Sequence, residues 1–521
     1  MAKNRNGRRA QQPAAPAPAQ RVRRQPDRIY QTGKSIPSLK NMDTDDGVLR
    51  PSRTEADFRN ATGAGPNAAG LVRLERERAK SRHEYLTSEY AARAKRIRVS
   101  YTVGGGIRPH IKGDPKLKKM WDAFVVDADP SGSMDFYQLQ ALALAEDLEG
   151  GEVFVVPRFR LPEDGLVVPL QIQLLESEYA PVGRFGGMPD RVIAGVELDL
   201  LERPVAYWLH ERHPSESYFL GTGVPAVKRY AADRVFHVFE RVRSGQLRGN
   251  TAIARTLSRL RNVEAYEKAD LQKKETAALL GVAVKMPTTD DDVAKVLGLK
   301  ADEREEGQTY AIAPLEPGAI FGLPPGADIS VINPGDTGAG YKDAWQTRYF
   351  GVATGLEVPY FLLTGDFSGI EERALRLAMI DFYKTIRADR RRLTHQMNRR
   401  VWRVFLDAAE RAGWKPPKGK TRADFEVVEW IGEPLPHIHP VQEVTAWKDA
   451  IRTGVKTLGE VLQENGSDLE TFIAEKKAEN AALDAAGIVL DCDPRHMTKA
   501  GGTQDAGYDE SAPTQQRANG A

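Results

Sequence analysis

The chain has 521 residues, with 74 Lys and Arg against 72 Asp and Glu, and its formal net charge at pH 7 is +2. This length predicts several domains, and the near-neutral balance means that any nucleic-acid binding must come from local patches. A single cysteine, Cys492, excludes an internal disulfide framework and a zinc site built from several cysteines, and it fits assembly in a reducing cytoplasm. No apolar run is long enough to predict a membrane span.

Both ends of the chain have the composition of disordered segments. Residues 1–40 mix Ala, Pro and Gln with the basic side chains of Lys3, Arg5, Arg8, Arg9, Arg21, Arg23, Arg24 and Arg28. We expect a disordered basic arm over 1–40, and an arm that touches a partner is the alternative. Residues 491–521 are rich in Gly, Asp, Thr and Gln and are expected to form a disordered tail.

Hydrophobic periodicity predicts an α+β body over residues 41–249. A charged helix is expected over 71–98, followed by a strand over Val99–Val103. A second helix is expected from an N-cap at Ser133 to a left-handed Gly150. Strands are expected at Glu152–Pro157 and at the alternating segments 170–174, 192–198, 205–209 and 235–239.

The pattern changes after Gly249. Residues 250–280 and 336–359 have the period of helices, and 281–335 between them form a separate small unit with short strands and a helix. This order predicts a small α/β unit mounted on two antiparallel helices. Its first half is acidic through Asp290, Asp291, Asp292, Glu303, Glu305 and Glu306.

A short loop, 360–373, leads into residues 374–435, which open with an unusually long helix. One face of this helix is apolar through Phe382, Ile386, Leu393, Met397, Val401, Val404, Phe405 and Ala408. The other face is basic through Arg387, Arg390, Arg391, Arg392, Arg399, Arg400 and Arg403. Residues 436–490 are predicted to be helical, and both Thr457-x-x-Glu460 and Ser467-x-x-Glu470 match the capping box.

Six segments in this order resemble the lambda family of tailed-phage portal proteins. They are VGGGIRPH (103–110), DFYQLQALALAEDLEGGEVFVV (135–156), GVELDLLERPVAYWL (195–209), HVFERVRSGQLRGN (237–250), GLEVPYFLLTGDFSG with the long helix after it, and HPVQEVTAWKDAIRTGVKTLGEVLQENGSD (439–468). The chain departs from the family pattern at Gly369–Glu372, where many members carry a polar run. It departs again at His439–Glu443, where Asp-Pro-x-Lys-Glu is usual.

The resemblance implies an α+β portal fold. Its parts would be a mixed α/β wing (41–249), stem helices (250–280 and 336–359), a small α/β clip (281–335), a tunnel loop (360–373), a long wing helix with its return (374–435) and a helical crown (436–490). It also implies a homo-oligomeric ring, usually dodecameric, at one capsid vertex of the virion, assembled in the host cytoplasm. By the same resemblance the ring passes double-stranded DNA without reading its sequence, and docks the terminase large subunit, the major capsid protein and head-completion or adaptor proteins.

The tunnel loop contains Thr364, Gly365, Asp366, Phe367, Ser368 and Gly369, with Arg373 just beyond. Its two glycines allow backbone movement. We expect Asp366 or Ser368 to cap a helix that begins near Ile370, and Phe367 to pack inside the wing. The alternative is that the Asp366 carboxylate, balanced by Arg373, keeps DNA from sticking.

Two charged regions have more than one interpretation. The acidic residues of the clip would steer a basic motor protein to it, or would only keep an exposed loop soluble. The arginines of the long helix would form a solvated face or ion pairs between subunits, or would face DNA phosphates.

No catalytic motif emerges. Gly33-Lys34-Ser35 lacks the glycine of a phosphate-binding loop, because Arg28 stands in its place. The pairs His437/His439 and His210/His213 lack a third ligand at a recognisable spacing. We therefore expect no enzyme activity, cofactor or metal. The alternative is a nuclease or motor component of the DNA-packaging apparatus, which would need a phosphate cradle or a carboxylate cluster.

Overall fold

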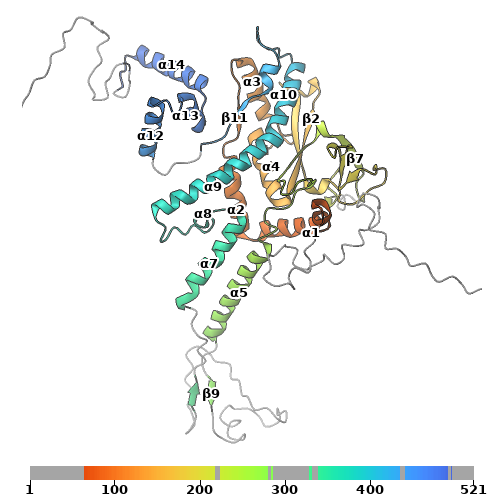
Figure 1. Ribbon diagram of the computed structural model, residues 1–521, viewed down its shortest axis with the longest axis vertical. Coiled ribbons are helices and arrows are strands. Elements are labelled where there is room, and N and C mark those ends of the chain that lie inside the picture. The colour runs from red at the N-terminus through yellow and green to blue at the C-terminus, as the bar shows by residue number, and fades with distance from the viewer. Residues whose placement is uncertain are drawn as a thin grey trace, which may run out of the picture.

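A computed structural model of the chain describes residues 64–216, 223–279, 283–285, 328–330, 338–434, 440–490 and Arg495. The predicted arm (1–40) and all of the predicted tail except Arg495 lie outside the described residues. Figure 1 shows helices packed on sheets in a central body, a pair of helices that projects from one end, and a group of short C-terminal helices at the other. Within the part of the chain that the structure describes, no helix is long and apolar enough to cross a membrane.

The body begins with two helices, α1 (Pro66–Thr87) and α2 (Glu89–Thr102). Ser88 between them has an extended backbone (φ −97°, ψ 119°), so the helix is interrupted there. The single helix expected over 71–98 and the strand expected over Val99–Val103 are therefore wrong. The end of α2 is helical because its side chains pack on the helix that contains Phe382. The ring centres of Tyr101 and Phe382 lie 5.3 Å apart.

The next helices, α3 (Pro115–Val126) and α4 (Phe136–Gly150), have aspartate caps. Asp114 caps α3 by accepting from the amide of Leu117, and Asp135 forms a capping box with Gln138 at the start of α4. The predicted cap Ser133 donates to Asp129 instead. The left-handed residue after α4 is Gly151 (φ 83°) rather than Gly150. The expected helix is confirmed, and its two ends are corrected.

The strands form small antiparallel sheets. The first contains β3 (Leu170–Glu176), β2 (Glu152–Phe159) and β8 (Phe236–Phe239) in that order, and the second contains β4 (Val192–Ile193), β5 (Val196–Leu198), β6 (Pro204–His210) and β7 (Val227–Ala231). Short 3₁₀ turns lie at Pro162–Asp164, Ser177–Tyr179 and Ala232–Arg234.

Strand β2 is buried on both faces. Val153 and Val155 face the helices of the main core, whereas Phe154 and Val156 pack against the second sheet. The strand expected at Glu152–Pro157 is therefore confirmed, and the protein combines helices with small sheets, as the α+β class requires.

The projecting pair consists of α5 (Leu257–Leu279) and α7 (Gly338–Leu356), which run side by side away from the body in Figure 1. Beyond them, β9 (Ala283–Lys285) pairs antiparallel with β10 (Asp328–Ser330). Helices thus lie where they are expected within 250–280 and 336–359.

After a short helix, α8 (Tyr360–Thr364), the long helix runs as α9 (Glu372–Leu393), a π-helical segment (Thr394–Asn398) and α10 (Arg399–Arg411). Its predicted apolar face is buried at Phe382, Ile386, Leu393, Met397, Val401, Phe405 and Ala408 and half-buried at Val404. From Leu393 onward this face packs on α3, α4 and the first sheet. Phe382 and Ile386 pack instead on α2 and α8. The chain returns through α11 (Ala423–Glu426) and β11 (Glu429–Ile431), which pairs with β1 (Arg108–His110).

Three helices follow the body: α12 (Pro440–Arg452), α13 (Leu458–Glu464) and α14 (Leu469–Ala486). The capping box of Thr457 and Glu460 is confirmed. The second one is wrong, because Asp468 rather than Ser467 caps α14 by accepting from the amide of Thr471.

Candidate functional site

The loop between α8 and α9, residues 365–371, is organised by the Asp366 carboxylate. Its Oδ1 accepts from the Ser368 amide (3.0 Å) and hydroxyl (2.6 Å), and its Oδ2 accepts from the Tyr360 hydroxyl (3.2 Å). The bonds from Ser368 hold the pKa of Asp366 below its usual value. Asp366 therefore shapes the loop itself.

The capping role expected for Asp366 or Ser368 is wrong. Helix α9 begins at Glu372 rather than near Ile370, and its N-cap, Glu371, makes no side-chain capping bond. Phe367 is also not packed inside the body: it is 55% exposed, with its ring 5.6 Å from that of Phe361. The sequence did not distinguish the two arrangements because an Asx turn and a helix cap use the same residue types.

The loop is open on its outer side. Gly365 (φ 78°) and Gly369 (φ 72°) are both left-handed, and a Cβ atom added at either would meet nothing within 4 Å. Thr364 closes α8 by donating to the Tyr360 carbonyl (2.9 Å), and Arg373 is exposed in the first turn of α9. The first five residues of the expected loop 360–373 are therefore helical, and its remaining residues up to 371 form an exposed turn.

The projecting helices approach each other closely at their base. A Cβ atom at Gly355 of α7 would lie 2.2 Å from the Thr256 hydroxyl, and one at Gly351 would lie 1.9 Å from the Arg259 guanidinium. Gly355 therefore needs to be glycine, because the β-branched Thr256 cannot move away, whereas the flexible end of Arg259 could yield to a side chain at 351. The Gly-x-x-x-Gly spacing in α7 is the one signal in the sequence that could have predicted this close approach.

One carboxylate binds aromatic side chains between these helices. Glu267 of α5 accepts from Trp345 Nε1 (3.1 Å) and from the Tyr349 hydroxyl (2.6 Å), both on α7. Tyr90 of α2 lies against Tyr349, with ring centres 4.4 Å apart. Burial, together with the bond to Glu267, raises the pKa of Tyr349. These contacts fix the helix pair to each other and to the body.

A buried ionic cluster lies where the body meets the connection to α5. Glu152 is fully buried and accepts from Arg78 (2.5 Å), Arg248 (2.7 Å), His237 (2.9 Å) and the Gly249 amide (2.8 Å). Burial raises the pKa of Glu152, but Arg248 and Arg78 outweigh it and hold the pKa well below its usual value. Burial also lowers the pKa of His237.

A second network connects α2, α4 and α9. Asp389 pairs with Arg98 (2.6 Å) and Arg392 (3.0 Å), and Arg392 also pairs with Asp147. Burial raises the pKa of Asp147 to about 6 in spite of Arg392. Arg98 lies 3.3 Å from Glu357 in the turn after α7, so the network reaches from the long helix to the end of the helix pair.

A group of possible metal ligands contains Glu176, Glu178 and His213. Arg82 lies among its carboxylates, 2.8 Å from Glu178 and 3.3 Å from Glu176. Burial raises the pKa of Glu178, but the bonds from Arg82 bring it down to about 2. The guanidinium already supplies the positive charge there, so these residues do not fit a metal. His210 bonds to the Pro225 carbonyl instead (2.9 Å).

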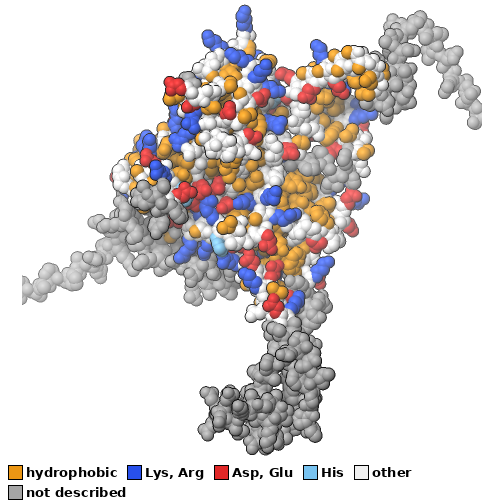
Figure 2. Space-filling view, turned by 180° about the vertical axis from the view of Figure 1, so that it is seen from behind, with side chains coloured by type: hydrophobic (Ala, Val, Ile, Leu, Met, Phe, Trp, Pro, Cys, Tyr) orange, Lys and Arg blue, Asp and Glu red, His pale blue; other side chains and the backbone are white. Residues whose placement is uncertain are grey.

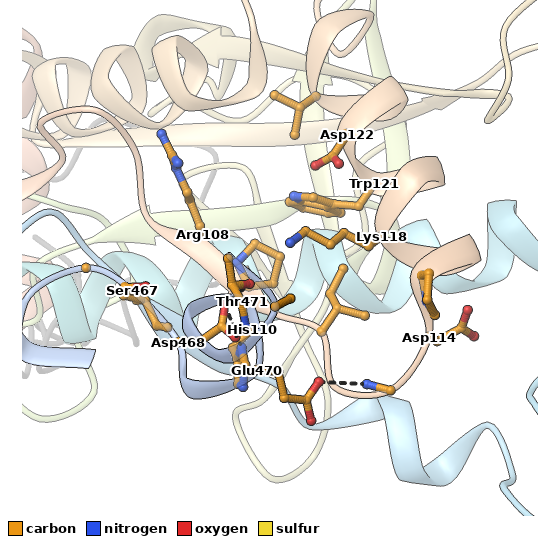
Figure 3. Close-up of a pocket in the computed structure, with 18 of the residues that line it drawn as sticks. Arg108, His110, Asp114, Lys118, Trp121, Asp122, Ser467, Asp468, Glu470 and Thr471 are labelled. Carbon is orange, nitrogen blue, oxygen red and sulfur yellow. Dashed lines mark hydrogen bonds and ion pairs between the residues drawn. The ribbon is translucent and has the colours of Figure 1, made fainter. Parts of the chain in front are cut away.

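A cleft of about 760 Å³ lies between the body and the C-terminal helices. Figure 3 shows Trp121 and Lys118 of α3 on one side, and Asp468 and Glu470 at the start of α14 on the other. His110 Nδ1 lies 3.5 Å from Asp468, and the Gly113 amide donates to Glu470 (3.3 Å). The cleft carries charges of both signs, and these two contacts hold α14 to the body.

The arginines predicted on one face of the long helix separate into two groups. Arg390 and Arg392 turn inward: Arg390 donates to the carbonyls of Thr102 (2.7 Å) and Tyr101 (2.8 Å), and Arg392 joins the network above. Arg387, Arg391, Arg399, Arg400 and Arg403 are exposed. On the face in Figure 2, basic and acidic side chains are intermixed, as expected for a near-neutral chain.

The acidic residues predicted to dock a partner lie outside the described residues. These are Asp290, Asp291, Asp292, Glu303, Glu305 and Glu306, and the same holds for His437 and His439. Their roles stay predictions.

Residues 52–390 match the family model described as phage portal protein, lambda family. The chain belongs to this family of portal proteins. The match includes both helices of the projecting pair, the loop at 365–371 and most of α9, so the resemblance seen in the sequence is confirmed.

Individual portal proteins are similar over about half of the chain. The probable portal protein of Halomonas phage phiHAP-1 is 25% identical over 310 residues, 57% of each chain. Portal protein B of Escherichia phage lambda is 22% identical over 57% of this chain and 59% of its own. The portal protein of Escherichia phage N15 is 22% identical over 48% of this chain and 51% of its own. The chain thus spans less than two-thirds of these relatives.

Similar chains occur in solved particle structures. One is in the neck of a native GTA particle computed with C12 symmetry (TM-score 0.44, 15% identity, 81% of this chain and 97% of that one). Another is in the neck of an empty GTA particle computed with C6 symmetry (TM-score 0.45, 14% identity, 76% and 93%).

Proposed function

We propose that this protein is the portal of a tailed phage: a homo-oligomeric ring at one capsid vertex that conducts double-stranded DNA during packaging and ejection. Family membership over 52–390 carries this proposal. The helix pair supports it, because two helices that project from a compact body suit the wall of a channel better than an enzyme pocket. A dodecamer is the stoichiometry that the family resemblance implies.

In this proposal the body over 41–249 is the wing, and 250–280 with 336–359 form the stem. Residues 281–335 form the clip, 360–373 the tunnel loop, 374–435 the long wing helix with its return, and 436–490 the crown. The close contact of Gly355 with Thr256 and the Glu267 contacts would keep each stem rigid within the ring. The Glu152 cluster would hold the stem at a constant angle to the wing.

The exposed turn at 365–371 supports a role at the channel. Its glycines leave the backbone free of steric hindrance, while the Asp366 bonds give the turn one preferred shape. The Asp366 carboxylate would repel phosphate, and the exposed Arg373 would offset that repulsion. Such a loop touches DNA weakly, which suits a conduit that must not retain its cargo.

The proposed partners are the terminase large subunit, the major capsid protein and a head-completion or adaptor protein. The clip is the proposed motor-docking surface through Asp290, Asp291 and Asp292. Neutralising these three aspartates should weaken terminase binding in a salt-sensitive way. Unchanged binding at low salt would remove the clip charges from the docking surface.

Electron microscopy of the purified protein tests the ring directly. We expect closed rings with a central channel, and only monomers or dimers under assembly conditions would contradict the proposal. Shortening the 365–369 turn should impair DNA packaging or retention and leave the rings intact. Metal-dependent nuclease and ATPase assays test the alternative, a catalytic component of the packaging apparatus. Robust turnover that a single acidic substitution abolishes would support that alternative.

A further inference from the structure

Five exposed basic residues follow one another along the long helix. Arg387, Arg391, His395, Arg399 and Arg403 follow one another at four-residue intervals, and all five are exposed. Among the described residues, none of the four arginines has a carboxylate within salt-bridge distance, whereas the neighbouring Arg392 is bound to two. We call these five residues the basic row.

The π-helical segment at Thr394–Asn398 limits how far the row drifts around the helix. Four residues advance an α-helix by about 40° more than a full turn, so a row at i+4 drifts around the helix. A π turn closes its bonds over five residues and rotates less per residue, which reverses part of this drift in the middle of the row. On an uninterrupted α-helix Arg387 and Arg403 would lie about 160° apart around the axis, and the π turn takes back roughly 100° of this offset. The row thus stays on one half of a helix that spans about 24 Å between its ends.

The segment is also held in place from the opposite side. Gln396 within it accepts from the Phe239 amide and donates to the Phe239 carbonyl, both at 3.0 Å, as a paired strand would. Met397 and Asn398 are buried against the body. The π turn is thus fixed by the edge of β8, and the row is presented on a rigid element.

We infer that the basic row binds the sugar–phosphate backbone of duplex DNA. The four guanidiniums, none of which pairs with a carboxylate of the described residues, extend along about 24 Å and would lie beside roughly seven phosphates of one strand. The inference deepens the proposed portal function, since duplex DNA is the cargo there, and it assigns DNA contact to the wing helix in addition to the tunnel loop.

Two other occupants fit less well. Single-stranded DNA is usually bound through exposed aromatic rings that stack on bases. The aromatic side chains of α9 and α10, by contrast, are buried or half-buried. A second copy of the chain would need a matching acidic row, and no described helix carries four carboxylates at four-residue intervals.

The test is the salt dependence of duplex binding by the full chain, measured by fluorescence anisotropy with a labelled duplex of mixed sequence. Each lost phosphate contact lowers the slope of log K against log salt by about 0.9. The double variant Arg391→Gln/Arg399→Gln should therefore reduce the slope by about 1.8. The matched control is Arg203→Gln/Arg229→Gln, which removes the same charge from arginines paired with Asp199 and Glu197 and should leave the slope unchanged.

The outcomes separate this inference from the portal proposal. An unchanged slope in the row variant, or an equal fall in the control, overturns the DNA contact and leaves the ring proposal standing. If the row variant keeps the slope but no longer assembles, as judged by light scattering, the row is a contact between subunits. Stronger binding of single strands than of duplex, lost in the row variant, would also overturn the choice of duplex.

Discussion

The body and the C-terminal helices of this protein differ in how much apolar surface each of them buries. In the body, Trp121, Trp402 and Phe405 lie in one continuous core that joins helices to the first sheet. Over residues 441–490, Val461 is the one buried side chain, and α14 buries none. Because hydrophobic stabilisation grows with the apolar area removed from water, the body carries its own stability. The C-terminal helices rely on caps and a few polar contacts.

The two regions also use charge differently. In the body, charged side chains are buried where several partners satisfy them, as Glu152 is by Arg78 and Arg248. In the C-terminal helices, pairs such as Lys456–Glu464 are partly exposed to solvent. Exposed ion pairs contribute little to the free energy of unfolding. Removing one member of a buried ionic cluster costs more, because it leaves the other charges buried without a partner. Substitutions should therefore have unequal effects in the two regions.

The largest effect is expected for Glu152→Gln. The substitution leaves Arg78 and Arg248 buried without a carboxylate, which costs about 3–5 kcal/mol of unfolding free energy. Chemical denaturation monitored by tryptophan fluorescence measures this loss. Glu197→Gln is the control, because Glu197 pairs with the half-exposed Arg229, and it should cost about 1 kcal/mol or less. Equal losses in the two variants would mean that burial of the cluster does not matter.

The sequence predicted the parts of this molecule whose signal is local. The strand at 152–157, the apolar face from Phe382 to Ala408 and the cap at Thr457 all follow from neighbouring residues, and all are confirmed. The Glu152 cluster was not predictable in this way, because its members are far apart in the chain. The break at Ser88 was missed because the apolar spacing of α1 continues into α2 without a Gly or Pro.

The candidate site was predicted in position and not in detail. The glycines at 365 and 369 marked an exposed turn, but the role of Asp366 depends on the Tyr360 hydroxyl, one helical turn earlier. For the long helix, composition marked a basic face. It could not indicate that Arg390 and Arg392 turn inward, since that depends on carbonyls and carboxylates of α2 and α4.

The next effect concerns the base of the helix pair. Gly355→Ala places a methyl group against the buried, β-branched Thr256, and overpacking of this kind costs about 1–3 kcal/mol. Thermal unfolding measures the loss. Gly459→Ala in α13 is the matched control: its nearest neighbour is 3.9 Å away, so the gain in helix propensity should dominate. Adding Thr256→Ala to Gly355→Ala should restore part of the stability, and no recovery would contradict the proposed clash.

A smaller effect tests the carboxylates around Arg82. Burial by itself would raise the pKa of Glu178, but the bonds from Arg82 outweigh this effect and lower the pKa to about 2 in the folded protein. A depressed acid pKa gives stability that is present above the unfolded value, near 4.5, and is lost as the pH falls towards 2. Glu178→Gln should cost about 1–2 kcal/mol at pH 7 and flatten the unfolding free energy between pH 4.5 and 2. An unchanged pH profile would contradict this role.

The smallest effect is expected in the C-terminal helices. Asp468 caps α14 through the Thr471 amide (2.8 Å) and hydroxyl (2.7 Å), and it lies 3.5 Å from His110 of the body. Asp468→Ala removes the cap and one of the contacts across the cleft, at a cost of about 0.5–2 kcal/mol. Because so little of α14 is buried, this loss should stay local. Hydrogen exchange should speed up in the first turns of α14 while the melting temperature of the body is unchanged.

Asp484→Ala, at the other end of α14, should leave exchange in the first turns as it is. A fall in the melting temperature of the body with Asp468→Ala would instead mean that the C-terminal helices fold cooperatively with it.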